Sequence, residues 1–208
     1  MTFEGFGPKA LDFFDRVKKD NTKTFFEAHR DDYNTHIRQP MEDLLGVAEA
    51  KYGTGRVTRP HRDVRFSANK EPYRINASMW AGTVGGVYLS LTLDGLEVGG
   101  GLYGPTRDQR ERARTAIDAQ PRAASTLNDI VETLASQGFE MAGPSLTTAP
   151  RGYDKENPNI SLLRLKHFAA LVTLPVAAPA AEIFETWSRV EPLIEWSEKY
   201  VGPALSWP

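Results

Sequence analysis

Apolar residues recur at every third or fourth position through the first fifty residues of the chain, which is the spacing that one buried helix face requires. Residues that begin helices interrupt this pattern: Pro8, Asn21 as an N-cap, and Pro40. A glycine, Gly53, then ends it. The N-terminal third is therefore predicted to be helical, in three segments: residues 8–18, 22–38 and 40–53.

The apolar period changes to two in the middle of the chain. Over residues 87–94 apolar and polar side chains alternate, and Asp94-Gly95 is the two-residue turn signal of a β-hairpin. The return strand follows directly, and two short strands bent around Pro60 are expected before the hairpin. This part of the chain is therefore predicted to form an antiparallel sheet.

Helical patterns return after the hairpin. Thr106 is a candidate N-cap, Pro121 suits a first helical turn, and Pro192 should bend the last helix. A helical turn that becomes a strand is expected over residues 161–175. The order of elements predicts an α+β fold in a single domain over residues 1–208, with an antiparallel-rich sheet packed with helices, a helical N-terminal third and a long C-terminal helix. A two-lobed arrangement around the sheet is the alternative.

Composition narrows the class of protein. The chain has 208 residues and no cysteine, which excludes disulfides, thiolate metal sites and a cysteine nucleophile. No secretory signal precedes the first helix, and the longest apolar run is interrupted by Pro175 and Pro179. We therefore expect a soluble, cytoplasmic protein without a membrane partner. A pI near 6.1 argues against a protein dedicated to coating DNA.

Positive charge is concentrated between Arg56 and Arg74. This segment holds six cationic side chains and two acids, in a chain whose formal net charge is -2. The planar arginine fork suits phosphate or carboxylate, so the segment predicts an anion site. Alternatively, its arginines pair with acids of the preceding helices and tie layers together. The candidate ligand-binding residues here are Arg62, Arg65, Ser67, Lys70, Tyr73 and Arg74.

Two later stretches supply further candidates. Gly99, Gly100 and Gly101 lie within a predicted strand, where glycine permits close approach of a ligand or of another backbone. Tight packing or a bulge explains them equally well. A second cationic stretch follows a loop of turn-forming residues, and a surface loop packed by its tyrosine is the alternative there. Its candidate ligand-binding residues are Arg151, Tyr153, Arg164 and Lys166.

Catalytic groups are less clearly indicated. Asp63, Asp154 and His167 are the candidates for moving a proton. His29 and His36 lack the i, i+4 spacing of a helical metalloprotease motif, so no metal and no cofactor is expected. Whether the chain is an enzyme is left open.

Four stretches together resemble one protein family, the DUF2461 proteins. They are "FGPKALDFFDRVKKDNTKTFFEAHRDDY", "RDVRFSANKEPYR", "GGVYLSLTLDGLEVGGGLYGP" and "PRGYDKENP" followed by "LLRLKH". The family often has acidic residues in place of Ala68 and Asn69, and lysine in place of Arg74. The resemblance implies a full-length domain found in bacteria and fungi. It implies no activity, because none is assigned to the family.

Three functions remain open from the sequence. The first is a binding module for a phosphorylated small molecule or another anion, and nucleic-acid ends are left undecided. The second is a phosphoester hydrolase or transferase that uses the same cations. The third is a structural or partner-binding protein, which an exposed apolar patch near Trp187 and Trp196 would favour. The oligomeric state is not indicated.

Overall fold

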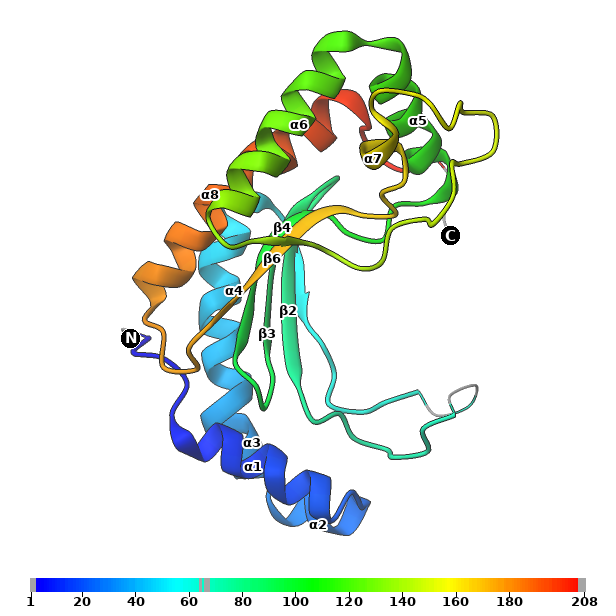
Figure 1. Cartoon of the computed structure of the whole chain (residues 1–208). Coiled ribbons are helices and arrows are strands. Elements are labelled where there is room, and N and C mark those ends of the chain that lie inside the picture. The colour runs from blue at the N-terminus through cyan, green and yellow to red at the C-terminus, as the bar shows by residue number, and fades with distance from the viewer. Residues whose placement is uncertain (1–2, 64, 66–67, 206–208) are drawn as a thin grey trace. The chain divides into compact units, whose positions relative to one another are not determined.

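A computed structural model describes residues 3–63, 65 and 68–205. Within them the predicted α+β class is confirmed, with six strands in one antiparallel sheet of order β1-β2-β3-β4-β6-β5 (Figure 1). Contacts divide the chain into two compact units. The first unit comprises Met1–Ala81, Tyr88–Val98 and Thr173–Glu185, and the second comprises Gly82–Val87, Gly99–Val172 and Thr186–Pro208.

The helical N-terminal third is confirmed, with one change in its segments. Its elements are α1 (Pro8–Lys19), α2 (Lys23–Ala28), α3 (Arg30–Tyr33), the π-helical turn η1 (Asn34–Arg38) and α4 (Gln39–Tyr52). Gly53 ends α4 with φ 101°, as predicted. The expected continuous second helix instead breaks at His29. Its N-cap is Thr22, whose hydroxyl accepts the Phe25 N–H, so the prediction of Asn21 as the cap is wrong.

Aromatic rings form the centre of the first unit. Phe13 lies edge-on to Phe26 at 5.8 Å between centroids, and both rings contact Tyr33. Burial raises the pKa of Tyr33 to about 12. The same cluster receives Tyr73 from the segment between β1 and β2. The apolar faces predicted from helical spacing therefore meet around residues from outside the helices.

The sequence predicted one pair of strands in the sheet, the hairpin, and missed the strand β2. The hairpin of β3 (Gly86–Leu91) and β4 (Leu96–Leu102) is confirmed, and the Thr92 N–H donates to the Gly95 carbonyl across its turn. β1 (Gly55–Val57) pairs antiparallel with β2 (Ala77–Gly82). The residues of β2 are mostly small or apolar, so they lack the polar alternation that marks a strand in sequence.

The second unit contains α5 (Arg107–Ala119), α6 (Pro121–Ser136), β5 (Glu140–Met141), α7 (Ile160–Leu163) and most of β6 (Phe168–Leu174). The last helix, α8 (Ala180–Tyr200), begins in the first unit and continues in the second. The predicted cap of α5 is confirmed, because Thr106 and Gln109 form a reciprocal capping box. The strand β5 has two residues, too few for any period to be read from the sequence.

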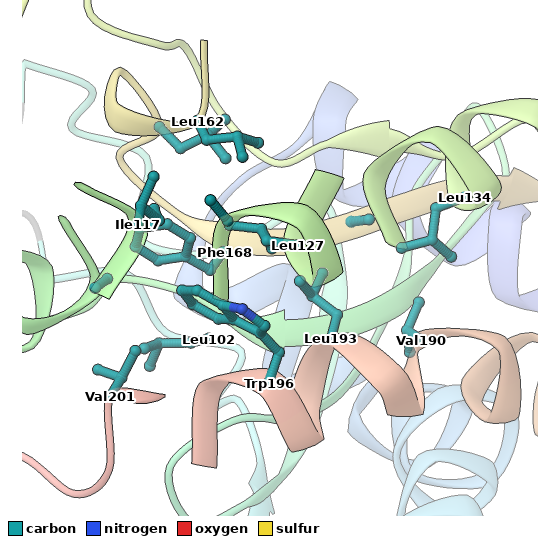
Figure 2. Close-up of a cluster of buried hydrophobic side chains, with 14 of the residues drawn as sticks. Leu102, Ile117, Leu127, Leu134, Leu162, Phe168, Val190, Leu193, Trp196 and Val201 are labelled. Carbon is teal, nitrogen blue, oxygen red and sulfur yellow. The ribbon is translucent and has the colours of Figure 1, made fainter. Parts of the chain in front are cut away.

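The core of the second unit gathers around Phe168 and Trp196, whose rings stack at 5.6 Å (Figure 2). The Trp196 indole N–H donates to the Ala123 carbonyl at 2.9 Å. Trp187 is also buried. The two tryptophans that were considered for an exposed apolar patch therefore belong to the interior.

No helix among the described residues combines the length and the apolar character that a membrane crossing requires.

Candidate functional site

The cationic segment forms a long extension of the hairpin between β1 and β2 (Figure 1). The ladder, in which Arg56 faces Trp80, continues through the Thr58 N–H, which donates to the Ser78 carbonyl at 2.7 Å. Farther out, a single antiparallel bridge joins His61 to Tyr73. This bridge is displaced by two residues from the register of the ladder, so the return side of the extension bulges between them. Of the short strand expected over residues 63–67, positions 64, 66 and 67 lie outside the described residues, including the candidate Ser67, and Asp63 and Arg65 are in no strand.

The base of this extension is fixed by contacts with α2 and with the turn that precedes it. The Asn21 amide clamps the backbone of Tyr73, since its Nδ2 donates to the carbonyl at 3.0 Å and its Oδ1 accepts the N–H at 2.9 Å. The Tyr73 ring lies parallel to Phe26, with centroids 4.1 Å apart and planes 4° apart. His61 contacts the same tyrosine ring at 4.8 Å. The bridge is thus held against the aromatic core.

This anchoring determines where two arginines lie. Because successive side chains of paired strands point to opposite sides, we expect Arg62 and Arg74 to lie on the side opposite to the bridged His61 and Tyr73. Their backbone N–H groups donate to Pro72 and Pro60 at 2.7 and 2.8 Å, on either side of the bridge. The two arginines are therefore diagonal neighbours, about 7–8 Å apart at the backbone, which long side chains can span. We call Arg62 and Arg74 the arginine face.

The arginine face has no acidic partner within the described part of the chain. Arg62 is half-buried, its Nε is fully buried, and this atom makes no hydrogen bond there. Four acids of the preceding helices are instead paired with cations of those helices, in the pairs Asp12–Arg16, Asp32–Arg16, Glu27–Arg30 and Glu42–Arg38. These contacts do not support the alternative in which the helices neutralise the segment.

Arg65 has a local partner. Its Nε and Nη2 donate to the two oxygens of Asp63 at 3.0 and 2.7 Å, and both side chains are exposed. These hydrogen bonds hold the pKa of Asp63 below its usual value. A carboxylate stabilised in this way is a weaker base, which reduces its suitability for the catalytic role considered from the sequence. Lys70 is exposed and makes further interactions of its own.

The three consecutive glycines lie in the second unit, where neighbouring protein atoms already fill the available space. A Cβ on Gly99 would lie 2.0 Å from the Ala170 carbonyl oxygen, and one on Gly101 would lie 2.3 Å from the Phe168 oxygen. On Gly100 it would lie 2.5 Å from the Gly86 oxygen. Real Cβ atoms do not approach this closely. Close backbone packing, one of the two explanations drawn from the sequence, accounts for all three.

The candidates between residues 151 and 167 also belong to the second unit, so they and the arginine face lie in different units. Arg151 is exposed, and Tyr153 packs on the core of its own unit. The Asp154 carboxylate accepts the Glu156 N–H at 2.9 Å and remains exposed. Arg164 is half-buried, with a buried Nε that makes no hydrogen bond to a described residue.

His167 has the most defined surroundings of these residues. Its Nδ1 accepts the Gly104 N–H at 2.9 Å, so the neutral ring carries its proton on Nε2. Its ring stacks on Tyr103, with centroids 4.5 Å apart. Burial, and then the positive charges of Arg110 and Lys166, lower the pKa of His167. A neutral imidazole is therefore favoured near neutral pH.

Comparison with known proteins gives a family. The family described as "Conserved hypothetical protein (DUF2461)" matches residues 9–196, which is nearly the whole chain. The chain belongs to this family. No curated protein and no solved structure matches it.

A polar network in this DUF2461 chain was missed by the sequence analysis. Ser78 Oγ lies 2.8 Å from Ser90 Oγ, and Asn76 Nδ2 donates to these two hydroxyls at 3.2 and 3.3 Å. The Tyr88 hydroxyl also reaches Ser78, at 3.4 Å. Alternation in β3 placed Tyr88 and Ser90 on one face, but β2 was not predicted, so nothing in the sequence joined them to Ser78. Across the described residues no group of three or more His, Asp or Glu is placed to hold a metal ion.

The lowered pKa of His167 predicts a pH dependence of stability in this DUF2461 protein. The unfolded chain binds a proton at this side chain near about pH 6.5, whereas the folded chain binds it only at lower pH. The free energy of unfolding should therefore decline as the pH falls below about 6.5, because the unfolded state then binds more protons.

Urea denaturation between about pH 7.5 and 5.5 measures this slope. His167→Gln, whose amide oxygen can still accept the Gly104 N–H, should have a shallower slope than the wild type. Arg110→Gln removes one of the two neighbouring charges and should reduce the slope in part. If the free energy of unfolding changed with pH by the same amount in all three proteins, His167 would not be the cause of the pH dependence.

Proposed function

We propose that this DUF2461 protein binds a phosphorylated or other anionic ligand on the arginine face, as a binding module that requires no catalytic group. The observation that carries this proposal is the state of Arg62. Arg62 is half-buried, and its guanidinium has a buried Nε without a hydrogen bond to any described residue. Leaving a buried charged donor without a partner is costly, and an anion bound beside this guanidinium would compensate its charge.

The position of Arg74 supports an anion rather than a neutral ligand. It lies diagonal to Arg62 on the same side of the bridge, it is exposed, and it forms no ion pair with a described residue. Two guanidinium groups on neighbouring positions favour a group with several acceptor oxygens. Phosphate meets this requirement better than a single carboxylate does, because it offers oxygens to both forks at once.

The fixed base of the hairpin extension favours binding. The Asn21 clamp and the Phe26–Tyr73 stack hold the backbone of both arginines in place before any ligand arrives. Less conformational entropy is then lost on binding, so more of the interaction energy is retained as affinity. The segment from Arg56 to Arg74 has six cations and two acids, and this excess of positive charge increases the rate of encounter with an anion.

A thermal-shift screen tests the proposal. Wild-type protein is scanned with phosphate, sulfate, sugar phosphates and nucleotides at about 50 and 300 mM salt, because exposed charges are screened over shorter distances as salt rises. A ligand that binds only the folded state raises the melting temperature by mass action. We expect a selective rise that is smaller at the higher salt concentration.

The double variant Arg62→Gln/Arg74→Gln should bind the selected ligand at least about 100-fold more weakly, since each of the two charge-assisted hydrogen bonds contributes about 1.5–3 kcal/mol. The matched control is Lys19→Gln/Arg122→Gln, which removes two positive charges at exposed positions elsewhere. The control should bind as the wild type does. Equal weakening of both variants would mean that overall charge, rather than the arginine face, governs binding.

A further inference from the structure

The second unit holds an aromatic surface that the arginine face does not include. Tyr103 is 69% exposed and is the most exposed aromatic side chain in the described part of the chain. One face of its ring lies against His167, with centroids 4.5 Å apart and planes 17° apart. Since that face is covered, the exposure belongs to the opposite face and the edge of the ring.

The ring is held in place from behind. His167 receives the Gly104 N–H on Nδ1 at 2.9 Å, which fixes the orientation of the imidazole. On another side, Gly143 approaches so closely that a Cβ at that position would lie 2.9 Å from the imidazole carbon Cδ2. The histidine is thus confined between two backbone segments. Tyr103 therefore presents a flat π-surface that loses little freedom when another ring stacks on it.

The surroundings of this surface are positively charged. Arg110 and Lys166 are close enough to His167 to lower its pKa, and no acid acts on that ring in the opposite direction. The two acids of α5 that flank Arg110, Asp108 and Glu111, are paired with Arg112 and Arg114. An exposed aromatic ring beside two cations matches a ligand that joins a planar ring to an anionic group.

We infer that the Tyr103–His167 stack is a binding site for a nucleobase that carries a phosphate, with Tyr103 stacking on the base and Arg110 and Lys166 attracting the phosphate. Any nucleobase can stack on an exposed aromatic side chain, because every base has a π-face. The same chemistry belongs to a free nucleotide and to the end of a nucleic-acid strand.

Calorimetric titration of the full chain tests this site, with adenosine monophosphate and ribose 5-phosphate as probes. The titrations are made in the Arg62→Gln/Arg74→Gln background, so that the arginine face contributes nothing to the result. Adenosine monophosphate should bind more tightly than ribose 5-phosphate, because only the former carries a base. Tyr103→Ala should weaken adenosine monophosphate by about 5- to 150-fold, the range that a base stacked on an aromatic side chain supplies.

Tyr103→Phe is the matched variant, because it keeps the π-surface and should bind within about twofold of the parent. Both substitutions are at an exposed side chain, and circular dichroism checks that the fold is retained. Equal affinity for adenosine monophosphate and ribose 5-phosphate, or no effect of Tyr103→Ala, would overturn the inference. If the Arg62→Gln/Arg74→Gln variant loses ribose 5-phosphate binding, that result tests the arginine face. It does not bear on the Tyr103–His167 site.

A short oligoadenylate distinguishes the two sources of the ligand. Binding at least about tenfold tighter than the mononucleotide, with the same dependence on Tyr103, identifies the end of a nucleic-acid strand. Equal affinity for the two identifies a free nucleotide. Both results support a site for a base with a phosphate.

Discussion

Replacing Tyr73 by alanine should lower the free energy of unfolding by about 3–5 kcal/mol, the range for removing a buried aromatic side chain. The ring is 2% exposed, and it is stacked on Phe26 in the centre of the first unit. The same substitution should weaken anion binding, because the bridge that holds Arg62 and Arg74 together would lose its anchor. Urea denaturation and the thermal-shift assay measure the two effects.

Tyr73→Phe is the control for the loss of the aromatic ring. Phenylalanine keeps the stack, and the Asn21 clamp contacts only the backbone, so this variant should stay within about 1 kcal/mol of the wild type and bind the anion normally. Asn21→Ala removes the clamp and leaves the ring, and it should cost about 1–3 kcal/mol. If Tyr73→Ala were as stable as Tyr73→Phe, the hairpin extension would not depend on the aromatic core.

The Gly99→Ala substitution should destabilise the protein by about 3 kcal/mol, the upper end of the usual range for overpacking. The added Cβ would meet the Ala170 carbonyl oxygen at 2.0 Å, and a backbone carbonyl cannot rotate away as a side chain can. The result is measured as the shift of the urea midpoint at unchanged slope.

Gly46→Ala is the control for the loss of glycine itself. Gly46 lies in α4 with no atom within 4 Å of an added Cβ, so alanine should stabilise the helix by about 0.5–1 kcal/mol. The two substitutions add the same methyl group and should have opposite signs. A Gly99→Ala protein with the wild-type midpoint would mean that β4 and β6 approach less closely than described.

The elements with a strong local pattern could be predicted from the sequence. The three-residue spacing of Phe14 and Val17 predicted α1, and Thr106 predicted the start of α5. The hairpin followed from alternation and the Asp94-Gly95 turn. In each case residues within one segment determine the element, so no knowledge of distant contacts is needed.

Features that depend on distant residues could not be predicted. Asn21 resembles a helix cap in sequence, yet its amide is used 52 residues away at Tyr73, and Thr22 caps α2 instead. The concentration of arginines gave the location of the candidate site. It could not separate Arg65, which is paired with Asp63, from Arg62, which has no such partner among the described residues. That distinction depends on the pairing of His61 with Tyr73, which no local period encodes.

The measurement that tests the arginine face most directly is nuclear magnetic resonance of the arginine Nε–Hε groups during titration with inorganic phosphate. The Arg62 resonance is assigned from its absence in Arg62→Lys. The account predicts a saturable shift of this resonance, because a phosphate bound at the arginine face would change the electrostatic surroundings of the Arg62 guanidinium. Arg30, whose Nε already donates to Glu27 at 3.0 Å, should not shift. The account would be contradicted if the Arg62 resonance did not shift while the resonances of exposed arginines all shifted by similar amounts.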